Sequence, residues 1–133
     1  MRVGKVNFAP LGVLALVAAF ILVDVHAAFA QSTRYWNRSV APGKQIEFQW
    51  LNFDERTCKD NGYAKLVIKK KPTLGRFRTV KRKFTQQTGR CKGKRFSVLL
   101  VYYVAGRKKG VDRTAYVVRG RDNLDINLKI TVK

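Results

Sequence analysis

Apolar and polar residues alternate along the chain after residue 43, and this period of two restricts the fold more than any other feature. In Lys44–Trp50, three apolar side chains fall on one face of an extended backbone and polar ones on the other, and Leu124–Lys133 repeats the pattern. Residues 31–133 contain no apolar stripe with the 3.6-residue period of a helix. The sequence therefore predicts strands that each have one buried and one solvent-exposed face.

A third segment, Arg95–Ala105, is apolar on both faces, which indicates a central strand that is covered on both sides. The shorter Arg113–Val118 follows it as a further strand. Six or seven short strands separated by Gly, Pro and Asn predict a single all-β domain, a β-sandwich.

Two strands flank the turn at residues 71–75. They are Tyr63–Lys70 and Arg76–Lys83, and between them Pro72 fixes one backbone dihedral while Gly75 tolerates a positive φ. We expect these two strands to pair with each other as a β-hairpin.

The first 30 residues have the features of a secretory signal peptide. Arg2 and Lys5 form a basic head, Leu11–Val23 is an apolar run, and Ala28 and Ala30 are the small residues of a cleavage site. A membrane anchor is the alternative, but a spanning helix needs roughly 20 apolar residues and this run is shorter. We expect cleavage, no transmembrane anchor afterwards, and a periplasmic or secreted protein. Residues 31–43 would then form an N-terminal extension or a first edge strand, and residues 44–133 the domain.

Catalysis is not expected of the chain that remains. Cleavage would remove His26, the only histidine, and with it any Ser-His or Cys-His nucleophile and the commonest ligand for zinc or copper. The acids Asp54, Glu55 and Asp60 lack the spacing of a calcium loop, and a solvated loop is the preferred interpretation. We therefore expect no enzyme activity, no cofactor and no metal site.

Cys58 and Cys91 are the only cysteines of the chain. In an exported protein paired thiols oxidise, and the chain offers neither a CxxC motif nor extra metal ligands. We predict a disulfide between them.

Several short motifs resemble landmarks of bacterial immunoglobulin-like, cadherin-like domains. The motifs are Lys71–Phe77 (KPTLGRF), Cys91, Val101–Tyr103 (VYY) and Lys108–Val118 (KKGVDRTAYVV). They are similar to the Pro-x-x-Gly-x-hydrophobic, Tyr-Thr-Pro and Gly-x-Asp-x-Phe-x-Tyr patterns of small exported proteobacterial proteins, most of unknown function. Val104 and Ala105 stand where the pattern has Thr-Pro, and Thr114 where it has Phe. The resemblance implies an immunoglobulin-like antiparallel sandwich of about seven strands, with no catalytic activity.

Gly110 and Asp112 mark a corner before a strand in this resemblance. Glycine admits unusual backbone angles, and an aspartate side chain accepts hydrogen bonds from backbone N–H groups in a turn. A catalytic acid would need a titratable partner, and only lysine and arginine lie nearby in the sequence. We predict a structural role for Asp112, and for Gly110, Pro72 and Gly75 as turn residues.

Charge is the feature that points to a function. Between Asn61 and Val111 the chain has no acidic residue and sixteen cations, which repel one another unless counterions or an anionic partner screen them. Two of these are Lys65 and Arg90. The other fourteen we assign to a polyanion-binding face: Lys69, Lys70, Lys71, Arg76, Arg78, Lys81, Arg82, Lys83, Lys92, Lys94, Arg95, Arg107, Lys108 and Lys109. A basic surface that only keeps the protein soluble is the alternative.

Export limits the anions that such a face would meet. Lipopolysaccharide phosphates, anionic lipid headgroups, acidic polysaccharides and acidic proteins are the candidate envelope partners. We expect no sequence-specific binding to nucleic acid, although the purified protein should bind phosphates without reading bases. The sequence thus predicts a non-catalytic module that binds anionic envelope polymers. The alternative is a small adaptor or inhibitor that docks on an acidic protein through edge strands or loops.

Cleavage after Ala30 is the first testable prediction. Mass spectrometry of the exported protein should show a chain that begins at Gln31. An N-terminus at Met1 or Arg2 on exported protein would contradict the signal peptide.

Overall fold

The computed structural model describes residues 32–120 and 122–133, so the predicted signal peptide and its cleavage site lie outside the described residues. The described chain folds into nine strands: β1 (Ser32–Val40), β2 (Gln45–Leu51), β3 (Phe53–Asp54), β4 (Lys59–Asp60), β5 (Lys65–Lys70), β6 (Gly75–Thr85), β7 (Arg95–Ala105), β8 (Gly110–Arg119) and β9 (Leu124–Val132). Among these residues, no helix is long and apolar enough to cross a membrane.

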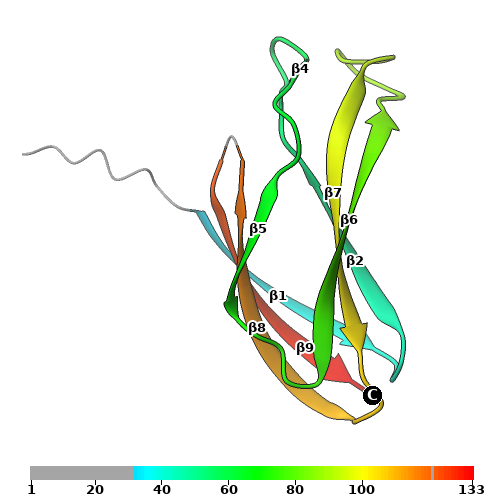
Figure 1. Ribbon diagram of the computed structural model, residues 1–133, viewed down its shortest axis with the longest axis vertical. Helices are drawn as coiled ribbons and strands as arrows, with labels where there is room; N and C mark the ends of the chain where they lie inside the picture. The colour runs from blue at the N-terminus through cyan, green and yellow to red at the C-terminus, as the bar shows by residue number, and fades with distance from the viewer. Residues whose placement is uncertain (1–31, 121) are drawn as a thin grey trace, which may run out of the picture.

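Seven of the strands form two sheets that pack face to face (Figure 1). The four-stranded sheet has the order β1-β9-β8-β5 and the three-stranded sheet the order β2-β7-β6, while β3 and β4 form a separate short ladder. The prediction of an all-β sandwich is confirmed. The described residues form nine strands rather than about seven. Seven belong to the two large sheets, and the other two, β3 and β4, are only two residues long each.

The prediction of a purely antiparallel sandwich is wrong at one edge. Strand β1 pairs with β9 in parallel, so that Trp36 lies opposite Leu128. Residues 32–40 therefore form an edge strand of the four-stranded sheet, and this parallel pair joins the first described strand to the last.

The predicted hairpin between Tyr63–Lys70 and Arg76–Lys83 is also wrong. Strand β5 pairs with β8, whereas β6 pairs with β7, so the connection at residues 71–74 crosses from one sheet to the other. Both strands have apolar residues that pack on the core from opposite sides, among them Leu66 on β5 and Phe77 on β6. The local turn signal does not distinguish such a sheet-to-sheet crossing from a hairpin.

Alternation along the strands places the core between the two sheets. Leu99, Val101 and Tyr103 of the central strand β7 face Tyr116 and its neighbours on β8 and β9. The side chains on the other face of β7, Val98, Leu100 and Tyr102, are also buried and form a small second cluster with Val80 of the neighbouring strand β6. The prediction that Arg95–Ala105 is a central strand covered on both faces is confirmed.

Cys58 and Cys91 form the predicted disulfide, with their Cα atoms 5.5 Å apart. The bond joins the loop before β4 to the loop between β6 and β7, 33 residues away in the sequence. It closes the end of the sandwich where the connections are longest.

Replacement of both cysteines (Cys58→Ser with Cys91→Ser) should lower the free energy of unfolding by about 3–4 kcal/mol, because the open chain regains the entropy of a loop of this length. Urea denaturation of the variant and of the native protein measures the difference. Thiol labelling of denatured, unreduced native protein should find no free thiol. Two reactive thiols, or an unchanged unfolding midpoint, would contradict the prediction.

Candidate anion-binding surface

Three loops and the C-terminus meet at one end of the sandwich, marked by the letter C in Figure 1. Backbone hydrogen bonds join them: Gly43 N–H donates to the carbonyl of Gly106 at 3.1 Å, and Gly106 N–H donates to the carbonyl of Leu74 at 2.8 Å. Lys133 N–H donates to the carbonyl of Val40. We call this region, residues 41–44, 71–74, 106–109 and Lys133, the loop end.

The loop end is basic. Its cations are all exposed and none forms an ion pair within the described residues. They are Lys44, Lys71, Arg107, Lys108, Lys109 and Lys133. The acid beside them, Asp112, is fully buried. The described part of this end therefore presents exposed cations and no exposed acidic side chain to the solution.

The Asp112 carboxylate on β8 anchors the loop at residues 71–74 and also binds the central strand β7. It accepts hydrogen bonds from the backbone N–H groups of Thr73 (3.0 Å) and Leu74 (2.9 Å), and from the hydroxyl of Tyr103 (2.7 Å). The Thr73 hydroxyl donates a further bond at 3.2 Å. Asp112 thus accepts backbone hydrogen bonds, as the sequence predicts, but the donors belong to the crossing at residues 71–74 rather than to its own corner.

Burial and hydrogen bonding act on Asp112 in opposite directions. Burial raises the pKa of its carboxyl, but the N–H groups of Thr73 and Leu74 and the hydroxyls of Tyr103 and Thr73 outweigh this and lower the pKa below its usual value. Burial and the bond to Asp112 raise the pKa of Tyr103. Asp112 is therefore ionised and Tyr103 neutral at physiological pH, which is the state that these hydrogen bonds require.

Gly75 has a different role from the one its sequence context indicates. It does not adopt a positive φ. A Cβ atom there would lie 2.5 Å from the carbonyl oxygen of Val104 and 2.7 Å from the Tyr103 ring, so glycine is required by a close approach. Gly110, by contrast, has the unusual backbone angle that its sequence context predicts, with φ at +150°.

The predicted cations on β6 divide between its two faces. Arg76, Arg78 and Arg82 lie on the outer face, where Arg78 stacks over the ring of Tyr102 at 4.5 Å. Lys81 and Lys83 lie on the opposite face, where each ammonium is 5.4 Å from the centre of the Tyr63 ring. Residues adjacent in the sequence thus do not form one binding cluster.

Other predicted cations are paired or lie elsewhere. Lys83 donates to the hydroxyl of Ser97 at 2.8 Å and contacts Asp60 at 3.4 Å, and Lys69 forms an ion pair with Asp125 at 3.3 Å. Lys92, Lys94 and Arg95 lie near the disulfide, at the opposite end of the sandwich from the loop end. The fourteen predicted residues therefore occupy several surfaces, and the structure brings Lys71 and residues 107–109 together.

Sequence reasoning missed Lys44 and Lys133. Both lie outside the acid-free span, and 89 positions separate them in the sequence. Only the pairing of β1 with β9 and the bonds between the loops bring them to the same end.

Of the acids near Cys58, Asp60 is bonded within the fold rather than solvated. Asp60 accepts bonds from the N–H and hydroxyl of Ser97, at 3.0 and 2.8 Å, and from the N–H of Gly62. Burial raises the pKa of Asp60, but these bonds and Lys83 outweigh it and lower that pKa. Within the described chain, no group of three or more His, Cys, Asp or Glu residues is arranged to hold a metal ion.

Comparison with known proteins does not assign the chain to a family. No family model and no curated protein sequence matches the chain. The solution structure of amebosin is similar with a TM-score of 0.44 and 11% identity, over 77% of this chain and 98% of that one.

Asp112→Asn should lower the free energy of unfolding at pH 7 by about 2–4 kcal/mol, because hydrogen bonds to a charged, buried acceptor are lost. The pKa of Asp112 is lower in the folded than in the unfolded chain, so its contribution is complete above the unfolded value of about 3.9 and is lost as the pH falls further. Denaturation of native protein and variant between pH 2 and pH 7 should show that the difference in stability shrinks with acid. A difference that is independent of pH would contradict the role of the charge.

Proposed function

We propose that this protein is a non-catalytic, exported immunoglobulin-like module that binds anionic polymers of the cell envelope, such as lipopolysaccharide, acidic polysaccharide or lipid headgroups. The observation that carries the proposal is the loop end, where six exposed cations lie on neighbouring segments without an exposed acid among the described residues. Because like charges this close repel one another, an anionic partner would relieve a cost that the fold alone does not offset.

The sheet orders support the immunoglobulin-like part of the proposal. One sheet contains β5, β8 and β9 as neighbours and the other contains β2, β7 and β6, which corresponds to the CFG and BED groupings of immunoglobulin domains. The buried position of Asp112 and of Tyr116 also agrees with structural roles for two landmarks of the bacterial cadherin-like pattern.

The disulfide supports an oxidising compartment, since such bonds persist in exported proteins and are rare in the cytosol. The acids of the described chain that have resolved pKa shifts have lowered rather than raised values, so none of these is adjusted to act as a general acid near neutral pH. These observations favour a binding role.

A second candidate function, an adaptor for an acidic protein, is favoured by one other feature. Strands β5 and β6 are edges of different sheets, and a groove of about 690 Å³ lies between them, lined by Leu66, Ile68 and Phe77 and bordered by Lys65 and Lys81. Sheet edges beside an apolar groove suit an extended peptide that adds a strand.

The proposed function predicts salt-dependent binding that depends on the loop end. Neutralising Arg107, Lys108 and Lys109 to glutamine should weaken heparin or lipopolysaccharide binding and flatten its dependence on salt, because with fewer contacts the complex releases fewer counterions. The matched control neutralises Arg90, Lys92 and Lys94, which changes the net charge equally at the opposite end. Titrations at low and high salt with all three proteins measure the effect.

Equal effects of the two triple variants would show that net charge alone matters, and absent binding of the native protein at low salt would contradict the proposal. Binding of an envelope protein that persists at high salt would favour the adaptor. Ile68→Lys separates the two functions further: it adds a cation, which does not weaken polyanion binding, but it places charge in the apolar groove and should weaken docking there.

A further inference from the structure

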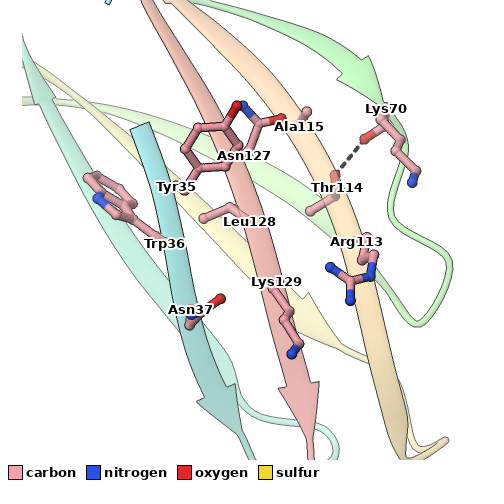
Figure 2. A pocket seen from close by; sticks show the side chains of 10 residues that line it. All are labelled: Tyr35, Trp36, Asn37, Lys70, Arg113, Thr114, Ala115, Asn127, Leu128 and Lys129. Atoms are coloured by element: carbon pink, nitrogen blue, oxygen red, sulfur yellow. Dashed lines mark hydrogen bonds between the residues drawn. The ribbon is translucent and has the colours of Figure 1, made fainter. Parts of the chain in front are cut away.

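A second basic site lies on the outer face of the four-stranded sheet, away from the loop end. It is a hollow of about 300 Å³, shown in Figure 2. We call it the sheet hollow and define it by Tyr35, Lys70, Arg113, Ala115, Asn127 and Lys129. Of these, only Lys70 belongs to the acid-free span of the sequence.

A β-bulge directs Lys70 to this face. Ile68 of β5 lies opposite the buried Tyr116, and the register then shifts so that Lys70 lies opposite Ala115. The hydroxyl of Thr114 donates a hydrogen bond to the carbonyl of Lys70 and so fixes the shifted strand (Figure 2). Without this shift in register, Lys70 would lie opposite Thr114 and face the core. Bulges that redirect a side chain are enriched at functional sites.

Like charges lie directly opposite each other in the next row of the hollow. Arg113 of β8 pairs with Lys129 of β9, both side chains are exposed, and neither has an ion pair among the described residues. Like charges at directly opposite positions destabilise a sheet. The one acid on this face within the described strands, Asp125, is paired with Lys69. An anion between Arg113 and Lys129 would remove the repulsion.

An aromatic ring and an amide complete the hollow. Tyr35 is 79% exposed on edge strand β1, and it lies opposite Asn127, which is half-buried. The small side chain of Ala115 leaves the floor between Tyr35 and Lys70 open (Figure 2). An exposed ring beside an open floor presents an apolar face on which a flat ligand stacks.

We propose that the sheet hollow binds one negatively charged sugar unit of an acidic polysaccharide. Tyr35 stacks on the face of the sugar ring, Arg113 and Lys129 bind its carboxylate or sulfate, and the Asn127 amide bonds a hydroxyl. Lys70 lies three strands from Tyr35 and contacts the neighbouring unit of the polymer. This inference rests on the proposed function and narrows its ligand from polyanions in general to carbohydrate.

The hollow also lies along the strands that lead to the loop end. Arg113 of β8 lies four residues after Lys109, the last residue of the loop before that strand, about 13 Å along an extended chain. One polymer chain can therefore contact both basic regions, with the hollow recognising a sugar and the loop end adding charge.

The test compares two polymers that carry similar charge but differ in chemistry: a heparin oligosaccharide and inorganic polyphosphate, at the same ionic strength. Tyr35→Ala should weaken heparin binding by about fivefold or more and leave polyphosphate binding unchanged, because only the sugar stacks. Tyr35→Phe keeps the ring and should bind both like the native protein. Arg113→Gln with Lys129→Gln should weaken both polymers, since charge is common to them. Unfolding midpoints of all variants check that each remains folded.

The outcomes distinguish the proposed sugar site from the polyanion-binding function on which it rests. If Tyr35→Ala affects both polymers equally or neither, while the loop-end variant still weakens binding, the hollow is not a sugar site and the polyanion function stands. Native protein that binds polyphosphate but not heparin leads to the same conclusion. If the native protein binds neither polymer at low salt, both proposals are wrong.

Discussion

A buried carboxylate organises the end of the molecule where cations gather. Asp112 lies on β8, but its oxygen atoms accept hydrogen bonds from the backbone N–H groups of Thr73 and Leu74 in the crossing between β5 and β6. The hydroxyl of Tyr103 binds the same group from β7. One side chain thus joins both sheets and anchors the loop that bears Lys71. The loop of residues 106–109 is bonded in turn to that loop, through Gly106 N–H and the carbonyl of Leu74.

The chain tolerates its high positive charge by using its acids selectively. Asp60 pairs with Lys83 and Asp125 with Lys69, while Glu47 lies beside the arginines of β6, and Gln49, Tyr102 and Arg82 lower its pKa. Exposed ion pairs contribute little to stability, so these contacts mainly limit repulsion. The loop end and the sheet hollow have no such compensation among the described residues, and these are the places where an external anion would change the electrostatic energy most.

Local patterns in the sequence predict the strands, the central β7 and the disulfide, because each depends on neighbouring residues or on the number of cysteines. They also predict that Asp112 accepts backbone hydrogen bonds, but not that the donors are Thr73 and Leu74, 39 and 38 residues away. The pairing of the strands is harder to predict from local sequence. A short turn with Pro72 looks the same in a hairpin and in a sheet-to-sheet crossing, and only the partners of β5 and β6 decide between them. The glycine at position 75 indicates a backbone angle when only its neighbours are considered, whereas the cause is the Tyr103 ring packed against it. The candidate site is predictable in charge but not in place, because β6 alternates its cations between two faces.

Because the cations alternate between faces, those that stabilise the fold are different residues from those that are available to bind a ligand. Cations that help the fold, such as Lys83, lie next to acids or aromatic rings and are poor candidates for binding. Arg113 and Lys129 have the opposite character, because they oppose each other across a ladder and folding gains nothing from that placement. Their neutralisation should relieve the sheet while it weakens ligand binding. A variant that gains stability but loses binding is expected where the replaced residues are retained for function. Replacement of a residue retained for the fold would lower both stability and binding.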